Sequence, residues 1–216
     1  MTSEDFIAKI CKLYKVSRTL SISAETYNIW RGVNHSISSQ SEDLLALFIA
    51  TNLEDNTLEF IVDKTMTCKI PHQKSIQFRP DLAIVKNGVL THSIDLKMDM
   101  GYKRRYFETP EFRSEALKFN ILRSQNFESV SYRKNNKRVE LKVSSKLTNQ
   151  IVVISEKNAG KPSNRLDMIK AIDNMNWVNI YYLTGGVHPN NYDDEFPIIN
   201  DNQFIKLIDD VKNLLN

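Results

Sequence analysis

The chain has 216 residues, of which 41% are hydrophobic and 25% charged, and its formal net charge is +3. This suits one globular domain with a sizeable core, and it excludes a basic surface that arises from a global excess of charge. Two cysteines exclude a disulfide framework. No apolar run approaches the ~20 residues that span a bilayer, and the acidic start is unlike a signal peptide, so we expect a cytoplasmic protein.

Helical and strand-like patterns alternate along the chain. The spacing of apolar residues predicts, in order, a helix over 4–14, a helix over 39–50, strands over 57–62 and 65–70, a hairpin over 80–97, a helix over 111–124, a strand over 150–155, a helix over 163–175, a strand over 178–183 and a helix over 201–214. Ser38 and Ser39 are expected to cap the second helix. The order predicts an α/β fold whose mixed sheet is covered by helices on both faces.

The hairpin contains an acid and a lysine in an otherwise apolar pattern. Asn87-Gly88 between two apolar runs is a strong hairpin signal. Asp95 and Lys97 are two residues apart in the second strand, so their side chains share one face while the apolar residues beside them point into the core. Burying such a pair without partners would cost several kcal/mol, which indicates a compensating interaction.

The length of the hairpin loop decides whether Asp81 joins that face. With a two-residue loop, Asp81 would lie opposite Ile94 and face away from Asp95. A three-residue loop over 86–88, ending on a left-handed glycine, pairs Val85 with Val89 and Asp81 with Ser93. We therefore predict a three-residue loop, with Asp81, Asp95 and Lys97 on one face and Asp81 diagonal to Asp95.

Two converging carboxylates repel each other unless they are protonated or bridged by a cation. Mg²⁺ is the expected cation because it takes hard oxygen ligands and keeps several waters, and we expect Mn²⁺ to substitute for it. A metal-bound water of lowered pKa can attack a phosphodiester. Lys97 would then orient or deprotonate that water, or neutralise charge in the transition state.

Pro80-Asp81, thirteen further residues and then Asp95-Leu96-Lys97 resemble the PD-(D/E)XK signature of type II restriction endonucleases and their relatives. The resemblance spans roughly residues 38 to 185. It implies a restriction-endonuclease-like core with a mixed sheet of four or five strands between helices. It also implies that Asp81 and Asp95 are metal ligands, that Leu96 offers its backbone carbonyl and that Lys97 is the catalytic lysine. Many members add a glutamate from the preceding helix, and Glu42 is the matching candidate.

Each of these residues also has an ordinary structural explanation. Asp81 is a common strand-opening residue after a proline. Asp95 and Lys97 fit the solvated face of a half-buried strand. Ser39 and Glu42 have the spacing of a capping box, which needs no catalysis to explain it.

Basic residues cluster after the hairpin, although the rest of the chain is nearly neutral. Arginine and lysine fit phosphate contacts, and arginine or asparagine can read base edges in the major groove. A solvated loop is the simpler alternative. The residues expected to contact DNA are Lys103, Arg104, Arg105, Arg133, Lys134, Asn135, Asn136, Lys137 and Arg138.

The resemblance therefore implies a Mg²⁺-dependent endonuclease that hydrolyses double-stranded DNA, most similar to a type II restriction enzyme and acting as a homodimer. Two alternatives stay open: a same-fold structure-specific, repair or toxin nuclease that acts on branched DNA or RNA, and a non-catalytic DNA-binding module. We expect one nuclease domain over 1–216. It would comprise a helical extension over 1–37, a catalytic core over 38–185 with a basic insertion near 130–148, and a C-terminal helix over 186–216.

Overall fold

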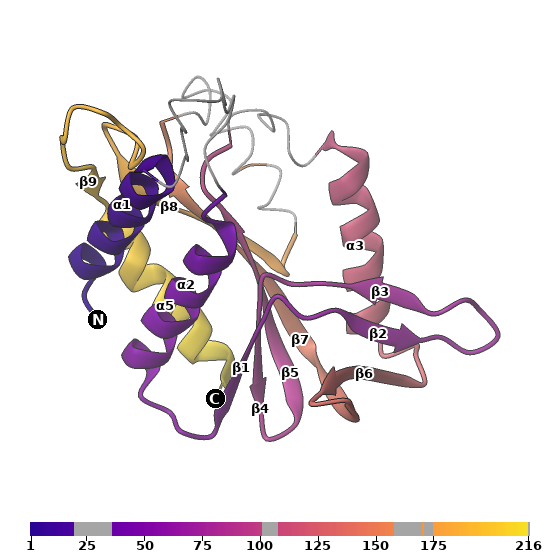
Figure 1. Cartoon of the computed structure of the whole chain (residues 1–216). Coiled ribbons are helices and arrows are strands. Elements are labelled where there is room, and N and C mark those ends of the chain that lie inside the picture. The colour runs from indigo at the N-terminus through magenta and orange to yellow at the C-terminus, as the bar shows by residue number, and fades with distance from the viewer. Residues whose placement is uncertain (20–35, 101–107, 158–169, 171–174, 216) are drawn as a thin grey trace, which may run out of the picture.

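The computed structural model describes residues 1–19, 36–100, 108–157, 170 and 175–215. In these residues, four helices flank an open, mixed sheet of nine strands (Figure 1). Helices α1 (Ser3–Thr19), α2 (Ser38–Leu53) and α5 (Asp201–Leu215) pack on one face, and α3 (Pro110–Arg123) packs on the other. The predicted α/β class is confirmed, whereas the expected four or five strands are wrong because the sheet has nine.

The nine strands are β1 (Leu58–Val62), β2 (Met66–Lys69), β3 (Ile76–Phe78), β4 (Leu82–Lys86), β5 (Val89–Lys97), β6 (Ser129–Lys134), β7 (Lys137–Ser155), β8 (Val178–Gly185) and β9 (Ile198–Ile199). Strand β7 pairs in parallel with β5 and with β8. The other strand pairs among the described residues are antiparallel. The parallel trio therefore forms the centre of the sheet, where burial on both faces is expected.

Strand β7 joins two parts of the sheet because its two ends have different neighbours. Its second half pairs with β8, whereas its first five residues pair with β6 in a hairpin. Strand β6 then pairs with β2, and β2 with β3. We call β2, β3 and β6 the arm, and Figure 1 shows them extending away from α1, α2 and α5. The segment expected as a basic insertion forms the hairpin that consists of β6 and the first part of β7.

Most predicted elements are present near their expected bounds, with α1 and α2 extending a few residues further. Strands β3, β6 and β9 and the first half of β7 were not predicted from the sequence. The helix expected over 163–175 falls almost wholly outside the described residues. Among the helices that the structure describes, none is both long enough and apolar enough to cross a membrane.

Two apolar cores hold the layers together, one on each face of the sheet. The core under α1, α2 and α5 is built around the rings of Phe6, Phe48 and Phe204, whose centroids lie 5.2–6.0 Å apart. The core under α3 contains Phe119 stacked on Trp177 at 5.1 Å between centroids. Such aromatic pairs contribute about 1 kcal/mol beyond the area that they bury.

The hairpin loop differs from the prediction. Lys86 pairs with Val89, so the turn has two residues, Asn87 and Gly88, with φ of 52° and 76°. Positive φ at both positions is what a tight two-residue hairpin turn requires, and Asn-Gly supplies it at low cost. The three-residue loop and the predicted pairing of Asp81 with Ser93 are therefore wrong.

A bulge at Thr91 restores the face that the two-residue turn would have reversed. The pairing passes from Val85–Leu90 to Ile84–His92 and leaves Thr91 out, while its hydroxyl donates to the Ile84 carbonyl at 3.0 Å. One extra residue reverses the direction of all later side chains. Leu90 accordingly packs in the α3 core and Ile94 in the opposite core.

Candidate active site

The bulge brings Asp81 level with Asp95. Ala83 pairs with Ser93 and Leu82 with Ile94, and continuing this register by one residue sets Asp81 beside Asp95. The two carboxyl groups hydrogen-bond to each other, and Asp81 Oδ2 accepts a hydrogen bond from the Leu96 backbone N–H at 2.7 Å. The predicted convergence of Asp81 and Asp95 on one face is therefore confirmed, although by a different register.

The electrostatics of Asp81 follow from that contact. Burial raises the pKa of Asp81 to about 7, and the negative charge of the Asp95 carboxylate adds to the rise. The Leu96 N–H and the Lys97 charge act in the opposite direction. Asp81 therefore keeps its proton until close to neutral pH, as expected of a buried acid beside a second carboxylate.

Lys97 lies on the same face, with its ammonium in contact with Asp95 Oδ1. Burial alone would lower the pKa of Lys97, but the hydrogen-bonded Asp95 carboxylate raises it above its usual range. Lys97 is therefore held as a cation at neutral pH. Residues 95–97 pair in parallel with 151–153 of β7, so a central strand fixes the position of this acid and lysine.

Glu42 in α2 carries a buried carboxyl oxygen. Its Oε2 accepts no hydrogen bond from any residue that the structure describes. Burial raises the pKa of Glu42, and the nearby Asp63 charge raises it further, whereas Arg79 and Lys97 lower it. A buried oxygen of this kind costs about 1–3 kcal/mol unless water or a cation satisfies it.

The capping-box explanation of Glu42 is wrong. Ile37 is the N-cap of α2, and Ser38 and Ser39 lie within the first turn of the helix. Among the residues that the structure describes, no side chain caps α2. The hydroxyl that bonds nearby is that of Ser41, which donates to the Ile37 carbonyl at 2.9 Å. Glu42 is therefore free of the structural role that its spacing from Ser39 indicated.

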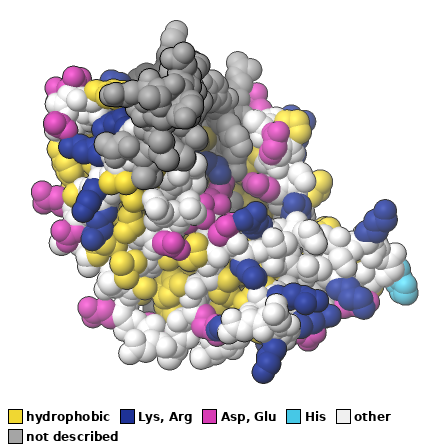
Figure 2. Space-filling model, in the orientation of Figure 1, with side chains coloured by type: hydrophobic (Ala, Val, Ile, Leu, Met, Phe, Trp, Pro, Cys, Tyr) yellow, Lys and Arg dark blue, Asp and Glu magenta, His cyan; other side chains and the backbone are white. Residues whose placement is uncertain are grey.

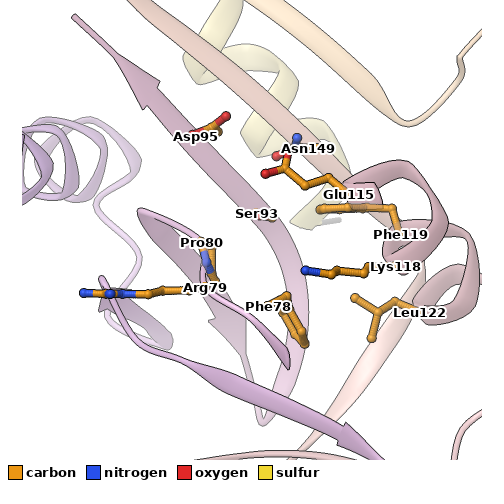
Figure 3. A pocket seen from close by; sticks show the side chains of 10 residues that line it. All are labelled: Phe78, Arg79, Pro80, Ser93, Asp95, Glu115, Lys118, Phe119, Leu122 and Asn149. Atoms are coloured by element: carbon orange, nitrogen blue, oxygen red, sulfur yellow. The ribbon is translucent and has the colours of Figure 1, made fainter. Parts of the chain in front are cut away.

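A pocket opens beside Asp95, between the sheet and α3 (Figure 3). The ten residues that line it are Phe78, Arg79, Pro80, Ser93, Asp95, Glu115, Lys118, Phe119, Leu122 and Asn149. Figure 3 shows Glu115 extending from α3 on the side of the pocket where Asp95 and Asn149 lie. The buried Oδ1 of Asn149 has no hydrogen-bond partner among the described residues.

Glu115 is a candidate functional residue that the sequence reasoning missed. It lines the pocket with Asp95, and its charge helps to raise the pKa of Lys97. A signal was present, because Glu115 interrupts the apolar stripe of Phe112, Phe119 and Leu122, which are all buried. An acid at a core-facing helical position indicates either a partner or a function.

The basic residues expected to contact DNA fall into two groups. Lys103, Arg104 and Arg105 lie outside the described residues. The other six, residues 133–138, are exposed at the tip of the β6–β7 hairpin. Asn135 and Asn136 form its turn, with φ of 49° and 63°. DNA contact by these residues stays a prediction.

The donors present fit Mg²⁺ in their chemistry, although they do not form a closed metal cage. Among the described residues, no three His, Cys, Asp or Glu side chains gather closely enough to hold a metal ion. Asp81 and Asp95 nevertheless present carboxylate oxygens at one point, and Glu42 holds a buried oxygen that has no hydrogen-bond partner in the described part of the chain. Hard oxygen ligands of this type suit Mg²⁺, which also keeps several of its own waters.

Comparisons of the chain with protein-family models, with curated proteins and with solved structures found no match.

Proposed function

We propose that the chain is a Mg²⁺-dependent endonuclease that hydrolyses phosphodiester bonds in double-stranded DNA. The observation that carries this proposal is the meeting of Asp81, Asp95 and Lys97 on one face of the β4–β5 hairpin, at the edge of a pocket. We also propose that α2, β1, β4, β5, α3, β7 and β8 form a restriction-endonuclease-like core. The order of these elements and the PD-(D/E)XK-like spacing support that assignment.

In this proposal Asp81, Asp95 and the Leu96 backbone carbonyl hold the metal, and Glu42 assists them. Bound Mg²⁺ would supply charge neutralisation and a water of lowered pKa. The chain supplies the alignment: the Leu96 N–H fixes one oxygen of Asp81, and the pairing of β5 with β7 fixes Asp95. Fixed ligands lower the cost of organising the site during reaction.

Lys97 acts as a cation in this scheme. The Asp95 carboxylate raises the pKa of Lys97, so its ammonium is charged at neutral pH. A charged ammonium in a half-buried site stabilises the negative charge that develops on the phosphate oxygens. Of the roles expected from the sequence, this arrangement favours charge neutralisation over proton abstraction.

The first test is to incubate the purified protein with plasmid and phage DNA in the presence of Mg²⁺, Mn²⁺ or chelator. Asp95→Ala and Lys97→Ala serve as active-site variants, and Lys9→Ala, at an exposed position of α1, serves as the control. We expect discrete, metal-dependent bands that both active-site variants lose and the control keeps. A smear lost in both variants would indicate a non-specific nuclease, and intact DNA throughout would contradict cleavage of duplex DNA.

The same fold can serve a different substrate, so branched DNA and RNA belong in the second test. A panel of duplex, branched and RNA substrates separates a restriction-like enzyme from a structure-specific, repair or toxin nuclease. Cutting both strands requires two sites, which is why we propose a homodimer. Plasmid that stops at nicked circles would contradict the homodimer.

A non-catalytic nucleic-acid-binding module is the second candidate, and one observation favours it. Asp81 accepts a hydrogen bond from Leu96, and Lys97 contacts Asp95, so the motif is largely satisfied within the chain. A site of this kind can persist for structural reasons alone. Nucleic acid binding without cleavage under any divalent metal would support this candidate.

A further inference from the structure

A second groove lies on the outer face of the arm, away from the pocket at Asp95. Its lining residues are Lys64, Thr65, Thr67, Lys69, Ser75, Ser131, Tyr132, Arg133 and Arg138. Four of these nine carry a positive charge, four others carry an aliphatic hydroxyl, and none of them is acidic. In Figure 2, Lys and Arg side chains gather over the arm.

Strand alternation explains why the groove residues of β2 and β6 share one face, apart from Tyr132, which belongs to the α3 core. In β2, Met66 and Cys68 are buried in the α3 core, so Thr67 and Lys69 point outward. Thr67 pairs with Ser131 of β6, and Arg133 follows two residues later on the same face. Side chains on one face of a strand lie about 7 Å apart, so the cations form an extended row.

The positive charge of the groove is only partly neutralised. Lys69 contacts Glu128 at 2.5 Å and Arg138 contacts Glu140 at 3.2 Å, but all four side chains are exposed. Exposed pairs of this kind contribute about 0–1 kcal/mol and exchange readily for another anion. No residue that the structure describes forms an ion pair with Arg133.

One end of the groove is linked to the candidate active site through Asp63. Lys64 follows Asp63, whose backbone N–H donates to the Asp81 carbonyl at 2.9 Å. The Asp63 carboxylate binds the Arg79 guanidinium through two hydrogen bonds of 2.5 and 2.6 Å. Arg79 in turn lines the pocket beside Asp95. Lys64, at one end of the groove, is therefore linked through Asp63 and Arg79 to the pocket beside Asp95.

We propose that this groove binds the phosphate backbone of the nucleic acid substrate, to one side of the bond that is cut. The inference rests on the proposed nuclease function for the position of that bond. Lysine and arginine supply the charge, and the threonine and serine hydroxyls supply further donors to phosphate oxygens. A row of cations spread over two strands fits a chain of phosphates better than a single small anion, which would need donors converging on one point.

The test measures binding without cleavage, by fluorescence anisotropy of a labelled duplex in the presence of chelator. The groove variant is the double substitution Lys64→Ala with Arg133→Ala, and Lys9→Ala is the control for loss of a remote positive charge. Each phosphate contact that is removed lowers the slope of log affinity against log salt by about 0.9. We expect the groove variant to lower the slope by about 2 and to weaken binding at least tenfold at 0.1 M salt.

A second variant guards against misfolding of the first. Thr67→Glu places a negative charge in the middle of the groove, at a side chain that points away from the core. We expect its affinity to fall at least as far as that of the double variant, with an unchanged melting temperature. Unchanged affinity and salt slope in both groove variants would overturn the inference.

The outcome for the groove is distinguishable from the outcome for the nuclease. If duplex DNA is cut and the groove variants bind it normally, the groove inference fails while the nuclease proposal stands. If no substrate is cut but the groove variants lose binding, the nuclease proposal fails and the groove remains a nucleic-acid site. Selective loss of RNA binding would assign the groove to that polymer.

Discussion

Replacing Asp81 with asparagine should stabilise the protein at pH 8. Burial and the Asp95 charge raise the pKa of Asp81 from 3.8 to about 7, so ionisation of Asp81 opposes folding at higher pH. Asparagine keeps an oxygen that can accept from the Leu96 N–H and carries no charge. Asp81→Asn therefore removes the repulsion and keeps the hydrogen bond.

The magnitude follows from the pKa. A rise of about three units at about 1.4 kcal/mol per unit sets a ceiling of about 4 kcal/mol. The Asp81 side chain is half-buried, and screening by water reduces the expected gain to about 2 kcal/mol.

The stability advantage of Asp81→Asn over the wild type should increase with pH. Between pH 3.8 and 7 the folded protein holds a proton on Asp81 that the unfolded chain has lost. The contribution of Asp81 to stability is thus complete below pH 3.8 and is lost as the pH rises through 7. The advantage of Asp81→Asn should therefore be largest at pH 8 and should shrink by more than half at pH 5.

Urea denaturation of both proteins at pH 5 and pH 8, with chelator, measures these differences. Asp43→Asn, at an exposed carboxylate of α2, is the matched control and should change stability by less than about 0.5 kcal/mol. Adding Mg²⁺ at ten times its Kd should stabilise the wild type by about 1.4 kcal/mol and Asp81→Asn by much less. If Asp81→Asn has the same free energy of unfolding as the wild type at pH 8, or an equal advantage at pH 5, ionisation of Asp81 does not oppose folding.

Three further predictions concern Glu42, His92 and Gly88. Glu42→Gln should reduce the plasmid-cleavage rate at least tenfold without loss of stability in urea, because its buried oxygen has no partner among the described residues; unchanged cleavage would exclude the assisting role. Burial lowers the pKa of His92 from 6.5 to about 4, so the unfolded chain takes up its proton first as the pH falls. As the pH falls from 6.5 to 4, the free energy of unfolding of His92→Leu should therefore rise by about 3 kcal/mol relative to that of the wild type. A difference between the two proteins that stays constant with pH in urea denaturation would contradict this. Gly88→Ala should cost about 1 kcal/mol in thermal melts from its φ of 76° alone, since nothing lies within 4 Å of an added Cβ; a loss above about 3 kcal/mol would show that the turn does more than reverse the chain.

The sequence specified the candidate site well because its signals are local. Asp95 and Lys97 share a face through strand alternation, and Asn87-Gly88 encodes the turn within two residues. The meeting of Asp81 with Asp95 was predicted through the wrong register. The prediction had a loop one residue too long and lacked the bulge, and these two errors cancelled. A shorter loop reversed the face and the bulge at Thr91 reversed it again.

Features that depend on distant segments were not predictable in this way. The bulge at Thr91 coincides with a shift in the pairing of β5 with β7, which is set by residues some fifty positions later. The arm forms because β2 pairs with β6, and the position of Glu115 depends on how α3 packs over the sheet. The N-cap of α2 is Ile37, so Ser38 and Ser39 fit the local capping pattern without occupying the cap position.

The most direct test of the proposed metal site is a Mn²⁺ titration of the wild type, Asp81→Asn and Asp95→Asn, with uncleavable duplex DNA present. We expect Mn²⁺ to bind each wild-type chain at the Asp81–Asp95 pair, to be displaced by excess Mg²⁺ and to be lost in both variants. Equal Mn²⁺ binding in Asp95→Asn, or no binding by the wild type, would contradict a metal-dependent active site at this hairpin.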